Sequence, residues 1–148
     1  MAGEDRYRLA PVRDARARDE RIRRGDLAVA VGDANETAAR LDAARGRTAA
    51  ARDQLAAAIA ARDALTATAT TRADQLVRAE QFIARRRAVL DRVLGEELRA
   101  EAAHDTRLGS LDEARRRLVR ARADREVIER HFTAWRQAQK KLADRRED

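Results

Sequence analysis

Residues 64–76 read ALTATATTRADQL, and this stretch decides how the rest of the chain is folded. Four threonines fall within Thr66–Thr71, and threonine is a poor helix former because branching at Cβ restricts χ1. From about Val12 onward, no strong helix breaker precedes this stretch. The sequence therefore predicts a turn near residues 66–72, with a long helix on each side of it.

Two ladders with a period of seven residues flank this predicted turn. The first ladder consists mostly of Leu and Ala: Leu27, Ala34, Leu41, Thr48 and Leu55. The second is longer and has polar interruptions: Leu76, Ile83, Leu90, Glu97, His104, Leu111, Leu118, Arg125 and Phe132. A sustained period of seven is typical of helices that supercoil around an apolar seam. We interpret polar seam residues such as His104 as fixing register.

These ladders predict an all-α fold, a long two-helix antiparallel coiled-coil hairpin formed by residues 1–148 as one domain. Helix 1 is expected at about 11–65 and helix 2 at about 73–146. If the chain reverses near Ala69, residue i faces roughly residue 138 − i. Leu41 then faces Glu97, while Tyr7 and Leu9 lie beside Phe132.

Trp135 follows Phe132 by three residues, a spacing that places both rings on one helix face. Aromatic residues make up only 3% of the chain, so this pair requires an explanation. One is packing against Tyr7 and Leu9 at the open end of the hairpin. The other is docking to a partner protein, and the two are compatible.

The composition excludes several classes of protein. Charged residues make up 40% of the 148, and the formal net charge is +7. The 26 acids are interleaved with the arginines, so this balance permits nucleic acid or an acidic partner without requiring either. Residues 1–20 lack the apolar core of a signal peptide, and no window approaches the ~18 apolar residues of a membrane span. We expect a soluble, cytoplasmic protein without membrane insertion.

Catalysis has few candidate residues here. The chain has one serine, Ser110, no cysteine, and no glycine-rich loop of a phosphate-binding type. His104 and His131 are far apart in sequence, and neither belongs to a cluster with metal-ligand spacing. We therefore expect no enzymatic activity, no cofactor and no metal.

Three segments resemble the FliJ/YscO family, the small stalk proteins of type III secretion and flagellar export. The first carries an aromatic residue, L-x-P-V and an arginine-rich helix start, in the positions Tyr7, Leu9, Pro11, Val12, Arg16, Glu20, Leu27, Ala28 and Ala30. The second is AEQFIARRRAVL, residues 79–90, which is similar to a stretch early in the family's second helix. The third is IERHFTAWRQAQKKLADRRED, residues 128–148, which looks like the YscO-type tail.

The resemblance implies a non-enzymatic stalk and escort protein at the centre of a hexameric export ATPase, promoting its assembly or activity. It implies that the open end of the hairpin binds the ATPase, through Tyr7, Arg8, Leu9, Phe132, Trp135 and Arg136. It further implies a contact between the second helix and the export-gate membrane protein, through Phe82, Arg86, Val89 and Val93. Arg86 departs from the apolar residue that the family has there. Export chaperones are further implied partners, and the implied location is cytoplasmic, at the inner-membrane secretion apparatus.

One alternative remains open at this point. The residues also suit a basic structural coiled coil that self-associates or binds nucleic acid. The net charge motivates nucleic acid, but the interleaved acids dilute it and few aromatic side chains are free to stack on bases. Nucleic acid is therefore not the expected partner.

Overall fold

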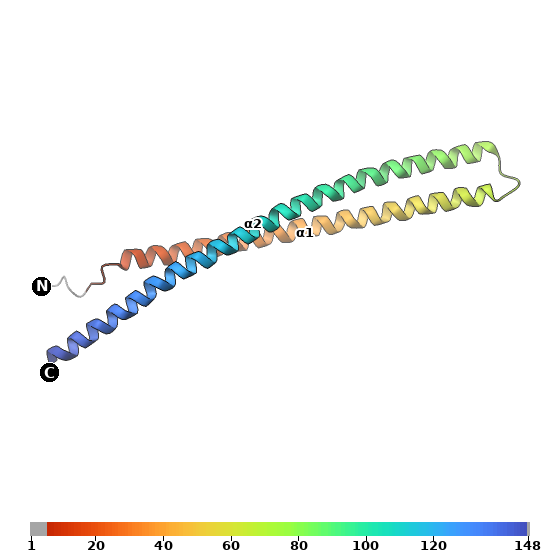
Figure 1. Cartoon of the computed structure of the whole chain (residues 1–148). Helices are drawn as coiled ribbons and strands as arrows, with labels where there is room; N and C mark the ends of the chain where they lie inside the picture. Colours follow the sequence, from red (N-terminus) through yellow and green to blue (C-terminus); the bar gives the residue numbers. More distant parts are fainter. Residues whose placement is uncertain (1–5, 148) are drawn as a thin grey trace. The chain divides into compact units, whose positions relative to one another are not determined.

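The computed structural model of the chain describes residues 6–147. These residues form two α-helices, α1 (Ala10–Thr66) and α2 (Ala73–Glu147), which pack antiparallel as a hairpin (Figure 1). The predicted fold class, helix bounds and turn are confirmed. The hairpin divides into two compact units: the end unit, residues 1–32 and 109–148, and the turn unit, residues 33–108.

The turn is closed by threonine hydroxyls rather than by glycine. The last carbonyls of a helix lack intrahelical partners, and here Thr71 Oγ1 donates to the Leu65 carbonyl at 2.6 Å and Thr68 Oγ1 to the Ala64 carbonyl at 3.1 Å. On the other side, the Arg72 backbone N–H donates to Gln75 Oε1 at 2.9 Å, which is one half of a capping box. The same threonines that weaken the helix therefore stabilise its end.

The core of the turn unit is a narrow seam. Ile83 is its largest fully buried side chain, with 1% of its surface exposed. The remaining buried positions are mostly small: Ala34, Thr37, Leu41, Ala44, Thr48, Ala51, Ala58 and Val93. Small side chains let the two backbones approach closely, so little apolar volume is needed to exclude water. Thr37 also forms a hydrogen bond with His104 Nδ1 at 2.9 Å, which confirms His104 as a polar seam residue.

The end unit repeats this construction with larger apolar residues on α2. Leu111, Ala114, Leu118, Ala121 and Ile128 are buried at the period of the second ladder. One carboxylate, that of Glu20, is buried with them. A charge taken out of water requires partners, and those of Glu20 are described below.

The predicted contact of Tyr7 with Phe132 is confirmed, but the register along the helices is shifted in both units. In the end unit, Arg13 pairs with Glu129, where the rule 138 − i gives Arg125. Glu97 was expected opposite Leu41, but its carboxylate lies 4.0 Å from Arg45, one turn nearer the loop. Thr37 likewise contacts His104 rather than Glu101, the residue that the rule 138 − i gives. An offset of about one turn keeps the same faces in contact, because seam positions recur every three or four residues. Hydrophobic periodicity therefore does not distinguish the two registers.

Candidate interaction surfaces

The three rings of the end unit pack on one another, and we call Tyr7, Phe132 and Trp135 the aromatic clasp. Tyr7 is only 6% exposed, and its ring centroid lies 5.0 Å from that of Phe132 and 5.2 Å from that of Trp135. Edge-on and tilted rings at these separations are favourable arrangements. The Ala10 N–H donates to the Tyr7 carbonyl at 3.2 Å, which holds this segment against the start of α1.

The polar end of the Tyr7 ring is satisfied by a histidine. The Tyr7 hydroxyl lies 2.9 Å from His131 Nδ1, and the two ring centroids are 5.7 Å apart. With a neutral His131 whose proton is on Nε2, the hydroxyl donates to Nδ1. The hydroxyl of a buried tyrosine usually requires such a hydrogen-bond partner, so His131 helps to hold Tyr7 in the clasp.

A cation covers one face of Phe132. The guanidinium carbon of Arg13 lies 4.1 Å from the Phe132 ring centroid, and Arg13 Nε donates to Glu129 Oε1 at 2.8 Å. The hydrogen bond from Arg13 lowers the pKa of the Glu129 carboxyl despite partial burial, and the same bond raises the pKa of Arg13. Arg136 approaches the same ring less closely, at 5.9 Å. The clasp is therefore fixed by ring, hydrogen-bond and cation–π contacts from both helices.

The residues predicted to bind an ATPase lie around this clasp. Tyr7, Arg8, Leu9 and Trp135 line a shallow groove of about 340 Å³, and Phe132 and Arg136 line another of about 300 Å³. The rings of Phe132 and Trp135 are half-buried, whereas Arg8 and Arg136 are exposed. The packing of these rings against Tyr7 is confirmed, and their role toward a partner stays a prediction.

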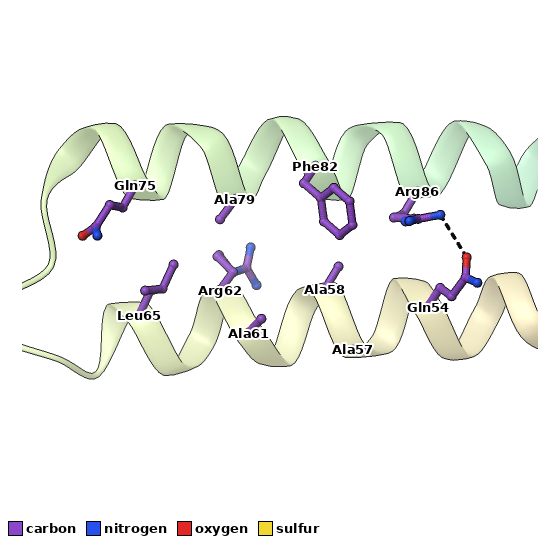
Figure 2. Close-up of a pocket in the computed structure, with 10 residues that line it drawn as sticks. All are labelled: Gln54, Ala57, Ala58, Ala61, Arg62, Leu65, Gln75, Ala79, Phe82 and Arg86. Carbon is purple, nitrogen blue, oxygen red and sulfur yellow. Dashed lines mark hydrogen bonds between the residues drawn. The ribbon is translucent and has the colours of Figure 1, made fainter.

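A second surface lies in the turn unit, in a groove of about 530 Å³ between α1 and α2 (Figure 2). Its lining is largely apolar: Ala57, Ala58, Ala61, Leu65, Ala79 and Phe82. Figure 2 shows the Phe82 ring directed from α2 toward α1. The guanidinium of Arg86 lies 4.8 Å from this ring, and its Nη1 donates to Gln54 Oε1 at 2.9 Å.

The four residues predicted for an export gate are placed differently from one another. Phe82 is 40% exposed, as its position beside the seam predicts, and it shares the groove with Arg86. Val89 is half-buried, and Val93 is 5% exposed because it packs in the seam. The structure thus brings Phe82 and Arg86 together and places Val93 in the core.

A third feature was missed by sequence reasoning: one buried carboxylate that three arginines share. The Glu20 side chain is 7% exposed, with Arg24 Nη2 at 2.6 Å and Arg125 Nη1 at 2.9 Å from its oxygens. Arg122 Nε lies at 3.7 Å. The hydrogen bond from Arg125 is the main cause that lowers the pKa of the Glu20 carboxyl, against the opposing effect of burial. We call Arg24, Arg122 and Arg125 the arginine cluster.

Weak signals for this cluster exist in the sequence. Arg125 interrupts the second ladder at a seam position, and Glu20 precedes Arg24 by one helical turn. The periodicity does not predict that Glu20 pairs with Arg122 and Arg125 of the other helix, because that pairing depends on the register.

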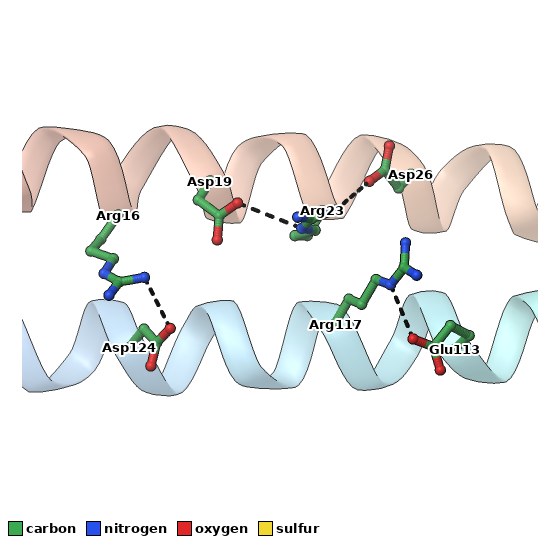
Figure 3. Close-up of polar contacts among 7 residues, drawn as sticks. All are labelled: Arg16, Asp19, Arg23, Asp26, Glu113, Arg117 and Asp124. Carbon is green, nitrogen blue, oxygen red and sulfur yellow. Dashed lines mark hydrogen bonds and ion pairs between the residues drawn. The ribbon is translucent and has the colours of Figure 1, made fainter.

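Most other arginines of the end unit that form ion pairs have their own carboxylates. Figure 3 shows Arg16 with Asp124 at 3.1 Å, and Arg117 with Glu113 at 3.0 Å. It also shows Arg23 between Asp19 and Asp26, at 3.5 and 3.4 Å. These exposed pairs each contribute little, on the order of 0–1 kcal/mol. They do, however, neutralise much of the surface around the helices.

Within residues 6–147, no group of three or more ligating side chains is arranged to hold a metal ion. Neither helix, over the same residues, contains a stretch long and apolar enough to cross a membrane. Comparisons of the chain with protein-family models, with curated proteins and with solved structures found no match.

Proposed function

We propose that this chain is a non-enzymatic stalk and escort component of a type III secretion apparatus, binding the centre of its hexameric export ATPase. The observation that carries the proposal is the aromatic clasp. Two of the three segments that resemble the FliJ/YscO family, around Tyr7 and around Phe132, are far apart in sequence and pack together in the end unit. This contact supports the proposal, because the resemblance implies that the same residues bind the ATPase together.

The end unit offers suitable anchors for a protein partner. Aromatic and arginine side chains dominate interface hot spots, and here Phe132 and Trp135 are half-buried beside the exposed Arg8 and Arg136. Half-buried rings are already ordered, so binding them costs less side-chain entropy than binding mobile ones. In this proposal the ATPase contacts the outer faces of rings whose inner faces Tyr7 holds.

The proposed contact with the export gate lies in the turn unit. The groove around Phe82 and Arg86 is the proposed contact for the cytoplasmic domain of the export-gate membrane protein. Export chaperones are proposed as additional ligands of the hairpin. The proposed location is the cytoplasm, peripheral to the inner-membrane secretion apparatus.

Co-purification with the export ATPase of the same apparatus tests this proposal. The chain should retain the ATPase on an affinity resin and increase the fraction of ATPase that migrates as a hexamer in gel filtration. Phe132→Ala/Trp135→Ala, which removes two rings of the clasp, should retain less of the ATPase. The matched control is Val119→Ala/Val127→Ala, which removes two exposed apolar side chains of α2 outside the clasp. If the wild-type chain neither retains the ATPase nor changes its oligomeric state over a wide concentration range, the proposed function is wrong.

A further inference from the structure

The positive charge of the chain is concentrated in one of its two units. Residues 1–32 and 109–148 contain 20 Arg and Lys against 14 Asp and Glu, whereas residues 33–108 contain 13 against 12. The end unit therefore contributes +6 of the net +7 and the turn unit +1. This charge difference attracts an acidic partner to the end unit, but it does not determine which residues the partner contacts.

The arginine cluster belongs to this positively charged end unit. Its three guanidiniums converge on one carboxylate, so the local sum is two positive charges in excess. Among the ion pairs of the described residues, Arg24, Arg122 and Arg125 have no partner other than Glu20. Their side chains are nevertheless substantially exposed, in contrast to the carboxylate beneath them.

The buried carboxylate orders this cluster in advance. A guanidinium has five N–H donors in a planar fork, and Glu20 is approached by one nitrogen of each arginine. Donors that do not face Glu20 remain for a second carboxylate, which a fork binds bidentately. Since Glu20 already restricts the three long side chains, less rotamer entropy is lost when the second anion binds.

We propose that the arginine cluster, held by Glu20, is a docking site for an acidic segment of a protein partner. This inference rests on the proposed function, in which the partner is the export ATPase, and it names the chemistry of that contact. Charge complementarity is what selects the occupant: two excess positive charges match a pair of Asp or Glu side chains.

The surroundings favour a protein over a nucleic acid. Asp124 and Glu126 lie in α2 between and beside the cluster's arginines, and Asp19 precedes Glu20 in α1. These carboxylates disfavour a continuous run of phosphates along the unit, whereas a short acidic segment needs to contact only the three arginines of the cluster. Bases also require open aromatic faces to stack on, and the rings of this unit are engaged in the clasp.

The test measures binding of a fluorescent hexaglutamate peptide by anisotropy at low salt. The test variant is Arg122→Gln/Arg125→Gln. The matched control is Arg116→Gln/Arg117→Gln, which removes the same charge from the same helix, where each arginine already pairs with Asp112 or Glu113. We expect the test variant to lose on the order of tenfold in affinity and the control about twofold or less, because the arginines of the cluster converge on one carboxylate, whereas Arg116 and Arg117 each pair with a carboxylate of their own. Helicity by circular dichroism verifies that both variants are folded.

Equal losses in the two variants would overturn the proposal, because net charge alone would then explain binding. Tighter binding of a single-stranded oligonucleotide, lost in the same test variant, would overturn it in favour of a nucleic acid site. The ATPase provides the second measurement. If it binds the wild type and the test variant equally, the cluster is not its docking site, although the proposed function stands. If it binds neither while the peptide discriminates, the proposed function fails and the cluster remains an acidic-peptide site.

Discussion

Replacing Tyr7 by alanine tests whether the aromatic clasp holds the start of the chain against α2. The wild-type side chain is 6% exposed and contacts two rings and a histidine. Tyr7→Phe is the companion variant, since it keeps the ring and removes only the hydroxyl that bonds His131. Val127→Ala is the control, because Val127 is an exposed apolar residue of α2 outside the clasp.

The magnitude follows from the buried area. A buried aromatic side chain removes roughly 150–250 Å² from water, and at about 25 cal/mol per Å² this amounts to about 4–6 kcal/mol. A compact unfolded state lowers the estimate to about 3–5 kcal/mol, which agrees with large-to-small aromatic substitutions in protein cores. Tyr7→Phe loses a single hydrogen bond and should cost about 0.5–1.5 kcal/mol.

Trp135 is the only tryptophan of the chain and lies 5.2 Å from the Tyr7 ring, so its fluorescence reports on the clasp directly. In Tyr7→Ala we expect stronger acrylamide quenching of Trp135, emission at longer wavelength and faster hydrogen exchange at residues 9–13. Because Tyr7 precedes α1, these changes should remain within the end unit. Tyr7→Phe and Val127→Ala should behave like the wild type in quenching.

Unchanged quenching and exchange in Tyr7→Ala would refute this reasoning. Trp135 would then not depend on Tyr7 for its environment, and the rings would have to be ordered by α2 alone. The estimate of the free energy is wrong if Tyr7→Phe lowers the free energy of unfolding as much as Tyr7→Ala does. The hydroxyl rather than the ring would then contribute most of the stability.

Three further predictions concern stability. Ile83→Ala should lower the free energy of unfolding by about 2–5 kcal/mol in chemical denaturation, because it empties the largest fully buried position, whereas the exposed Leu98→Ala should change it little. Gly46→Ala should raise the melting temperature, with a gain of about 1 kcal/mol, since the glycine is inside α1 and an added Cβ meets no atom within 4 Å. Glu20 and Glu129 have lowered pKa values in the folded state, so stability should fall as the pH drops below the usual range for glutamate and through those lowered values; Glu20→Gln should weaken this acid dependence in thermal melts.

Each of these predictions has an opposite outcome that would contradict it. An Ile83→Ala variant as stable as the wild type would mean that the seam closes over the lost volume. A Gly46→Ala variant of lower stability would mean that the added methyl group meets a neighbouring atom at that face of α1. An acid transition unchanged by Glu20→Gln would mean that Glu20 contributes no stability through its arginines.

The sequence was sufficient for the architecture because the hairpin depends on local and periodic signals. Period-seven ladders predict the seam, and a cluster of threonines weakens the helix enough to predict the loop between Thr66 and Ala73. The aromatic clasp also followed, since Tyr7 and Phe132 are near the two ends of a chain that reverses in the middle. The register along the two helices did not follow, because a shift of about one turn keeps the seam residues buried.

The arginine cluster shows what periodicity leaves out. Glu20 lies seven residues before Leu27 and so continues the first ladder by one period, but a period of seven does not indicate which partners a charged seam residue has. Its burial depends on Arg122 and Arg125 arriving from the other helix at the correct register. Similarly, Val93 belongs to the predicted gate stripe by resemblance, but its position in the seam directs it to the core.

The most direct test of the proposed function is the turnover of the cognate export ATPase, measured with and without this protein. We expect the wild-type chain and Val119→Ala/Val127→Ala to increase turnover, and Phe132→Ala/Trp135→Ala to leave it unchanged although that variant remains helical. Turnover that the wild-type chain leaves unchanged across a wide concentration range would contradict the stalk function.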